Sequence, residues 1–173
     1  MPAVERLNDS PSADKIKDAL TVGAYSYPDQ SVSAVQRQDS QHSENNPLLE
    51  YMMLISLSGR LQKKINDMKN LKPNWDTYGA EPPESEAKNV ARELLVCMER
   101  RRFLPTDAVA STEGGVALSF MSENRYADIE CLNTGEILAV TVIGQEEPVV
   151  WEVAKSNASF IEAIERIHDH IFP

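Results

Sequence analysis

The sequence predicts an α+β fold in which two N-terminal helices precede a four-stranded antiparallel meander and a C-terminal helix, with the helices on one face of the sheet. Three observations lead to this prediction. Apolar residues recur with helical spacing in residues 47–72 and 83–102. Residues 115–153 instead contain short alternating apolar stretches separated by turns rich in Gly, Asn and Pro. Helical spacing returns after Ser156, and helices layered on one side of the sheet would complete one core.

Residues 1–46 have the composition of a disordered arm. They are rich in Ser, Asp, Gln, Asn and Pro, and their apolar residues are scattered rather than periodic. Such a segment buries too little apolar surface to offset the entropy that it would lose on ordering. We therefore expect a disordered, low-complexity N-terminal arm at 1–46 and a single α+β domain at 47–173.

Local capping residues set the expected helix boundaries. Asn46 can cap a first helix that begins at Pro47, because proline is best tolerated at the first helical position. Pro83 is expected to start the second helix for the same reason. The last helix is expected to begin at Ser156.

The first half of the first helix is apolar on more than one side. Leu48, Leu54 and Ile55 add apolar side chains outside the main apolar stripe of this helix. Such a segment either lies deep in the core or forms a dimerisation surface. A homodimer through the helix at 48–57 is therefore one expected assembly.

Four strands are expected in quick succession, and short turns between them predict antiparallel neighbours. Gly114-Gly115 is interpreted as a two-residue hairpin turn before the first strand. Glu136–Ile143 is apolar on both faces, which is typical of a central strand. The expected strands are Val116–Phe120, Arg125–Leu132, Glu136–Ile143 and Val149–Val153.

The net charge of −10 is unevenly distributed along the chain. Residues 47–73 carry five basic and two acidic side chains, whereas residues 74–173 carry 8 basic and 18 acidic ones. A negative surface repels nucleic acid and favours basic protein surfaces, so direct nucleic-acid binding is disfavoured. The alternative is that the acidity only keeps the protein soluble.

Three acids fall at strand positions whose neighbours are apolar: Asp128, Glu130 and Glu152. This alternation places them on the sheet face that the helices leave open. An open face with acidic side chains is a candidate docking surface for a basic partner, and it is also what an ordinary solvated face looks like.

The segment 74–82, which joins the first two helices, has an unusual composition for a loop. Trp75 and Tyr78 are interpreted as anchors that fill apolar gaps, while Asp76 or Asn74 binds loose backbone amides and Gly79 supplies a positive φ. Alternatively, Trp75, Asp76 and Tyr78 form an exposed recognition patch, since Trp and Tyr dominate binding hot spots.

The run Asn-Trp-Asp-Thr-Tyr-Gly-Ala-Glu-Pro at 74–82 resembles the Asn-Trp-Asp-Gly-Tyr-Gly-Ala-x-Pro motif of a loose group of small bacterial and phage proteins. In that group the motif is likewise followed by a helix and a strand meander, a pattern that residues 71–153 share. The resemblance implies a bacterial or phage origin and a shared local fold, and it assigns no role to any residue. Thr77 stands where the group usually has Gly, which suggests a less sharp turn.

No catalytic residue, cofactor site or metal site is expected. Cys97 and Cys131 lie within apolar stretches, which is typical of buried, reduced thiols in a cytoplasmic protein. His168 and His170 are two apart on a helix, so their imidazoles point to different sides and cannot share one metal ion. No apolar run approaches the length of a membrane helix, and the N-terminus lacks the features of a signal peptide.

These observations favour a cytoplasmic, non-catalytic protein that binds another protein or protein complex with a basic surface. Small size, acidity and an arm that could fold on a target are typical of bacterial or phage antitoxins, immunity proteins and inhibitors of host defence. One alternative is an acidic, dimeric chaperone of the secretion type or an assembly subunit. A second is an enzyme whose site is not visible in the sequence.

Overall fold

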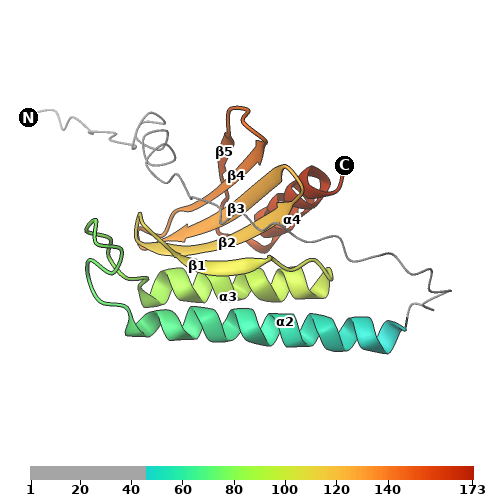
Figure 1. The fold of residues 1–173 in the computed structure, drawn as a ribbon, viewed down its shortest axis with the longest axis horizontal. Coiled ribbons are helices and arrows are strands. Elements are labelled where there is room, and N and C mark those ends of the chain that lie inside the picture. The colour runs from blue at the N-terminus through green and yellow to red at the C-terminus, as the bar shows by residue number, and fades with distance from the viewer. Residues whose placement is uncertain (1–45) are drawn as a thin grey trace, which may run out of the picture. The chain divides into compact units, whose positions relative to one another are not determined.

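The computed structural model describes residues 46–173, and the predictions made for the arm at 1–45 lie outside these residues. The elements follow one another as helix α2 (Pro47–Asp67), the 3₁₀ turn η1 (Met68–Asn70), helix α3 (Ser85–Arg100), strands β1 (Asp107–Ser111), β2 (Gly115–Ser122), β3 (Arg125–Leu132), β4 (Ile137–Ile143) and β5 (Val149–Glu152), and helix α4 (Asn157–Ile171). Figure 1 shows α2 and α3 side by side below the sheet, with α4 beside β3. The predicted α+β class is confirmed.

The sheet has five strands in the order β1-β2-β3-β4-β5, and each pairs with its neighbours antiparallel. The prediction of four strands was wrong, because the sequence Asp-Ala-Val-Ala-Ser of β1 carries few residues that favour strands. Pairing with β2, from Asp107 opposite Ser119 to Ser111 opposite Gly115, defines this edge strand. Residues 112–114 form the turn between them, so the prediction of a two-residue Gly114-Gly115 turn was also wrong.

One face of the sheet carries the hydrophobic core. Alternate residues of β2 and β3, among them Leu118, Phe120 and Ile129, are fully buried against α3 and α4. The helices contribute residues at helical spacing, such as Leu94 and Ile164. The helix stripes and the strand alternation therefore meet in one apolar layer, and the intervening strand residues face the other way.

Helix α2 packs on α3 and on the edge strand β1 through its second half only. Asn46 caps it as predicted, since its Oδ1 accepts a hydrogen bond of 3.1 Å from the Leu48 amide. Its buried residues are Ser58, Leu61 and Ile65, all beyond the middle of the helix. The first half is mostly exposed, so the first of the two alternatives, a position deep in the core, is wrong, and the dimerisation surface stays a prediction.

The start of α3 is held by a side chain that is remote in the sequence. The Asn133 Oδ1 accepts a hydrogen bond of 2.8 Å from the Glu84 amide, and its Nδ2 donates to the Pro82 carbonyl at 3.0 Å. These bonds hold the Pro82–Glu84 segment extended, and the helix begins at Ser85 rather than at Pro83. Helix α4 begins at Asn157, one residue after the predicted start, because Ser156 is its cap and its Oγ accepts a hydrogen bond from the Ser159 amide at 3.2 Å.

We expect Gly115→Ala to destabilise the protein strongly. A Cβ at this position would lie 2.3 Å from the Cys131 carbonyl oxygen, a backbone atom of the paired strand that cannot move independently. The expected loss is about 2–3 kcal/mol in the free energy of unfolding, measured by urea denaturation. The matched control is Gly135→Ala, which has a positive φ of 89° but open space around it, and should cost only about 1 kcal/mol. Equal losses for the two variants would contradict this interpretation.

Candidate functional site

The central strand β3 carries a polar cluster on the face that points away from α3 and α4. Asp128 pairs with Ser119 on one side and Val140 on the other, and Glu130 pairs with Ala117 and Leu138. Because the core residues of β3 alternate with these positions, both carboxylates lie on the opposite face, as the sequence predicted.

Glu152 extends this cluster towards the edge of the sheet. It pairs with Leu138, which in turn pairs with Glu130, so the three residues form one row across β3, β4 and β5. The structure thus brings together the three acids that the sequence assigned to this face. Asp128 and Glu130 are partly buried, whereas Glu152 is exposed.

The two carboxylates of β3 differ in how well their oxygens are hydrogen-bonded. Glu130 accepts a hydrogen bond from the Ser111 hydroxyl, which itself accepts from the Glu113 amide at 3.1 Å. Asp128 accepts one bond through Oδ2, from the Tyr126 hydroxyl at 2.8 Å. Its other oxygen, Oδ1, is buried without a hydrogen-bond partner among the residues that the structure describes.

The surroundings of Asp128 favour its protonated form. Burial raises its pKa to about 7, and the nearby Glu130 carboxylate adds to this effect, although the Tyr126 hydrogen bond opposes it. Burial also raises the pKa of Glu130, which the Ser111 hydrogen bond partly offsets. The pKa of Tyr126 is raised as well, so its hydroxyl stays protonated and donates. This face therefore holds two carboxylates that are each hydrogen-bonded by one hydroxyl, and no ion pair joins either of them to a basic side chain among the described residues.

Small and apolar neighbours explain why the carboxylates of Asp128 and Glu130 are desolvated. Ala117 and Val140, which flank the two carboxylates in the register, are only 7% and 5% exposed. Ser111 is also buried. The expectation of a freely open, solvated face therefore needs correction, because the middle of the face is recessed while its margins are exposed.

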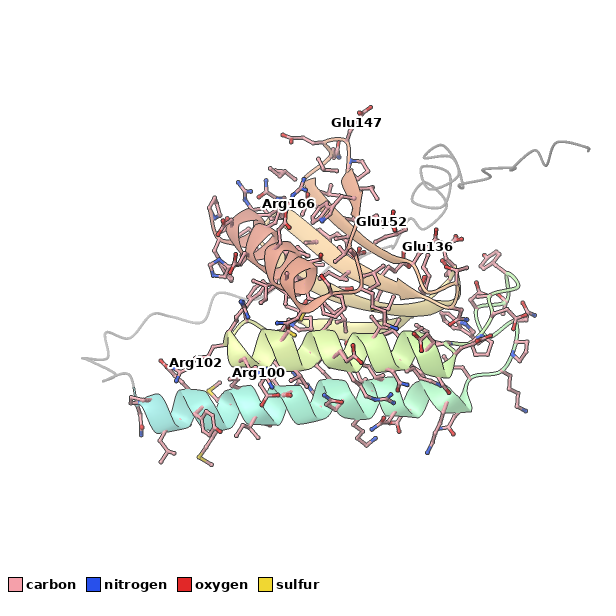
Figure 2. All side chains as sticks on the ribbon, turned by 180° about the vertical axis from the view of Figure 1, so that it is seen from behind. Arg100, Arg102, Glu136, Glu147, Glu152 and Arg166 are labelled. Carbon is pink, nitrogen blue, oxygen red and sulfur yellow. The ribbon has the colours of Figure 1, made fainter. Side chains whose placement is uncertain are left out.

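Several exposed acids lie near the β4–β5 edge of the sheet. Figure 2 shows Glu136, Glu147 and Glu152 around β4 and β5, whereas Arg100 and Arg102 lie at the C-terminal end of α3. Arg166 of α4 lies 3.8 Å from the centre of the Trp151 ring, on the helix side of the sheet. The helix side also carries acids, among them Glu93 of α3 and Glu165 of α4, so acidity is not confined to the sheet face.

The loop at 74–82 is held by its own side chains. The Asp76 Oδ1 accepts hydrogen bonds from the Tyr78 and Ala80 amides at 2.9 and 3.0 Å, and the Asn74 Oδ1 accepts from the Gly79 amide at 2.8 Å. These bonds, first that from Ala80, lower the pKa of Asp76. The predicted amide-binding role of Asn74 and Asp76 is confirmed, as is the positive φ of Gly79, which is 101°.

The two aromatic residues of this loop differ in burial. Trp75 is partly buried, and its Nε1 donates to the Glu81 carbonyl at 3.4 Å. Tyr78 is 91% exposed, so the prediction that it fills an apolar gap was wrong. The loop turns back on itself through the bond between the Asn74 amide and the Ala80 carbonyl at 2.8 Å, which leaves Tyr78 at its tip.

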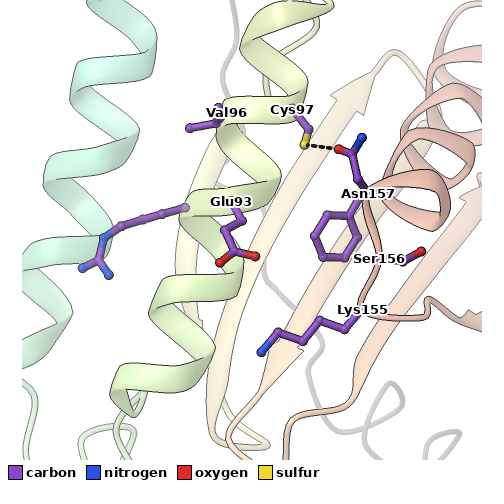
Figure 3. A pocket seen from close by; sticks show the side chains of 8 residues that line it. Glu93, Val96, Cys97, Lys155, Ser156 and Asn157 are labelled. Atoms are coloured by element: carbon purple, nitrogen blue, oxygen red, sulfur yellow. Dashed lines mark hydrogen bonds between the residues drawn. The ribbon is translucent and has the colours of Figure 1, made fainter.

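A groove between α3 and the segment that leads into α4 has a volume of about 540 Å³. Figure 3 shows Glu93, Val96 and Cys97 on one wall and Lys155, Ser156 and Asn157 on the other. The Cys97 thiol lies 3.5 Å from the Asn157 Oδ1, and among the described residues no hydrogen bond joins it to Glu93 or Lys155, which also line this groove. The arrangement does not assemble a nucleophile with its base.

The other residues considered for chemistry have structural contacts. Cys131 is buried, and burial raises its pKa to about 12, so the thiol stays protonated. The His170 Nε2 lies 3.1 Å from the carbonyls of Tyr126 and Val142, while His168 packs against Phe103.

Two kinds of feature, a metal-binding group and a membrane-spanning helix, are absent from the part of the chain that the structure describes. Residues 46–173 contain no group of three or more His, Cys, Asp or Glu side chains that could hold a metal ion. None of the helices between Pro47 and Ile171 is long and apolar enough to cross a membrane.

No protein-family model, no curated protein and no solved structure matches this chain. The resemblance of residues 74–82 to the small bacterial and phage proteins therefore stays a prediction. The site has to be interpreted from its own geometry.

Sequence reasoning missed two members of the sheet-face cluster. Tyr126 lies two residues before Asp128, so the same strand alternation that selected the acids would also have selected it. Ser111 belongs to β1, which was not predicted, so no sequence pattern placed it beside Glu130.

We expect Asp128→Asn to stabilise the protein at pH 8 by about 1–3 kcal/mol. The folded-state pKa of Asp128 is about 7, and its unfolded value is about 4, so the folded state retains a proton that the unfolded state releases. The wild type therefore loses stability as the pH rises from about 4 through 7, and the variant lacks this loss. Urea unfolding at pH 5, 6, 7 and 8 measures the difference, and a difference that is constant with pH would rule out a desolvated carboxylate.

We expect Thr77→Gly to raise the thermal midpoint. Thr77 has a φ of 71°, a left-handed conformation that is costly for a β-branched residue. Relief of this backbone strain stabilises the folded state by more than the added entropy of glycine stabilises the unfolded chain. The expected net gain in the free energy of unfolding is about 0.5–1 kcal/mol. Gly79→Ala, which removes glycine from the other left-handed position, is the opposite control and should lower the midpoint. A gain for both variants would show that φ is not the controlling factor.

Proposed function

We propose that this protein is a non-catalytic binding protein whose sheet face receives a basic segment of another protein. The acidic face consists of Asp128, Glu130 and Glu152 with the associated Tyr126 and Ser111. Within this proposal, the protein belongs to the bacterial or phage class of antitoxins, immunity proteins and inhibitors of host defence. Small size, net charge of −10 and the acidity of residues 74–173 support that class.

The observation that carries the proposal is the buried Asp128 Oδ1 atom, which has no hydrogen-bond partner within residues 46–173. A buried carboxylate oxygen that accepts no hydrogen bond costs about 1–3 kcal/mol or more in the isolated protein. Residues that lower the stability of a folded chain are typical of functional sites, because a ligand supplies the missing interaction. The missing interaction here is a hydrogen-bond donor, and preferably a cation.

Arginine fits this requirement best. Side chains two residues apart on one strand face lie about 7 Å apart, which allows one guanidinium or two neighbouring cations to contact both Asp128 and Glu130. Arginine carries five donors in a planar arrangement and loses less on desolvation than lysine does. A charge-assisted bond to the buried Oδ1 would also return the pKa of Asp128 towards its ordinary value.

The margins of the face favour a protein partner over a small molecule. Val109 and Met121 lie on the same side of the sheet as Asp128, and they are 37% and 48% exposed. A recessed polar centre with exposed apolar side chains around it suits an extended or helical segment that covers several strands. Such an interface weakens with salt, because its attraction is electrostatic.

A second candidate function, an acidic dimeric chaperone or assembly subunit, is favoured by a different surface. Helix α2 exposes large apolar side chains at Leu48, Leu49 and Met52 in its first turns. A chaperone of this type would use the dimer to hold an unfolded client segment rather than a folded basic protein. The two candidates therefore differ in the state of the partner.

The test is affinity capture from the source cell with the tagged full-length chain. We expect a stoichiometric protein partner that elutes between low and high salt. The variant Asp128→Asn/Glu130→Gln should lose this partner by at least tenfold in recovered amount, because two central charges are removed.

The matched control is Glu146→Gln/Glu147→Gln, which removes the same charge from exposed positions in the β4–β5 turn. It should retain the partner. Equal loss for both double variants would show that only net charge matters, and recovery of no stoichiometric protein by the wild type would refute the proposal.

A further inference from the structure

The first three turns of α2 form an unusually apolar exposed surface. Six large apolar side chains in this segment are between 45% and 65% exposed. They are Leu48, Leu49, Tyr51, Met52, Met53 and Ile55. Between Pro47 and Gly59 the only charged residue is Glu50, so the surface also lacks the charges that keep exposed helices in water.

The fold leaves this surface without a partner inside the described residues. Figure 1 shows α2 extending beyond the end of α3, so the overhanging turns have no helix beside them. Contacts with the core begin only at Leu54, Leu57 and Ser58. An isolated stretch of about three turns has little helical stability of its own, and it needs packing to stay ordered.

Part of this surface forms a regular stripe. Leu48, Met52, Ile55 and Gly59 follow one another at intervals of four, three and four residues, the spacing of a coiled-coil seam. The stripe lies away from the side that packs through Leu61 and Ile65. A stripe with this spacing packs against a second helix whose apolar residues have the same spacing.

We infer that α2 pairs with α2 of a second copy of this chain, antiparallel and about a two-fold axis between Met52 and Ile55. In this register Met52 of each copy contacts Ile55 of the other, and Leu48 lies opposite Gly59. Gly59 has open space around its Cβ position, so the large Leu48 side chain fits against it. A parallel pair would set Gly59 against Gly59 and leave a gap, so the antiparallel pair fills the stripe better.

Size and charge support a second copy as the occupant. Five of the large side chains can enter this pairing: Leu48, Met52 and Ile55 in the stripe, and Leu49 and Tyr51 at its flanks, whereas Met53 lies outside it. Each is about half exposed, so they present roughly 500 Å² per copy, and a pair buries at most about 1,000 Å², which is the lower limit of specific interfaces. Glu50 lies on the opposite side of the helix, so the stripe carries no charge that would repel the second copy.

This pairing uses the helix side of the domain and leaves the acidic sheet face free. The dimer therefore presents two separate partner-binding faces, which would increase avidity for a partner with two sites. The inference stands independently of the proposed function, because it depends on α2 alone.

The first test measures the molecular mass of the full-length chain in solution by sedimentation equilibrium, at protein concentrations between 1 and 100 µM. We expect a concentration-dependent dimer that Met52→Asp weakens by at least tenfold in its dissociation constant. Val96→Asp is the matched control, because Val96 is an exposed apolar residue (41%) of α3 outside the stripe, and it should leave the dimer intact. A monomer at 100 µM, or a dimer that Met52→Asp leaves unchanged, would overturn the inference; either outcome would leave the acidic face to be judged by its own test.

The second test fixes the register. A mixture of one chain with Met52→Cys and another with Ile55→Cys should form the mixed disulfide under mild oxidation much faster than either chain forms a disulfide with itself. Gly59→Leu should weaken association at least fivefold although it adds apolar surface, because the added side chain would collide with Leu48 of the partner. Faster self-crosslinking of each single variant, or a stronger dimer with Gly59→Leu, would indicate a parallel pair and contradict the register.

Discussion

The alternation of side chains along β2 and β3 is the constraint on which both the core and the candidate site depend. Leu118, Phe120 and Ile129 face α3 and α4, so they are buried in the apolar layer. A strand has a period of two, and every residue between these positions therefore has to face the other side. Asp128 and Glu130 lie on the exposed face because the core occupies the alternate positions. A shift of one residue in the register would bury both carboxylates in the core, and the apolar layer fixes the register for that reason.

The same constraint makes the candidate site costly for the isolated domain. Position 128 is flanked by Ser119 and Val140, and the Asp128 carboxylate is partly buried, with one oxygen that has no partner in the described part of the chain. An ordinary solvated sheet face would carry acids whose oxygens reach water. Burial raises the pKa of both Asp128 and Glu130, whereas carboxylates on a fully solvated face would not be shifted by burial.

The two surfaces that we propose for binding differ in their physical character. The sheet face combines partly buried carboxylates with a few exposed apolar side chains, and it suits a partner of opposite charge. The overhanging turns of α2 are apolar and nearly uncharged, and they suit an identical helix. Since α2 packs on α3 and β1 through Leu61 and Ile65, its outer stripe and the acidic face can be occupied at the same time.

The sequence by itself determined the α+β class, the cap of α2 at Asn46, the last helix to within one residue at its start, and the face on which Asp128, Glu130 and Glu152 lie. These features follow from local chemistry and from periodicity, which a single chain displays directly. Only the tertiary structure decided the existence of β1, the exposure of Tyr78 and the exposed position of the first half of α2. Strand β1 is defined by its pairing with β2, since its own residues favour no structure strongly. The orphaned oxygen of Asp128 and the bond between Ser111 and Glu130 likewise arise from residues on different strands, and no pattern within one strand specifies how deeply its neighbours bury a side chain.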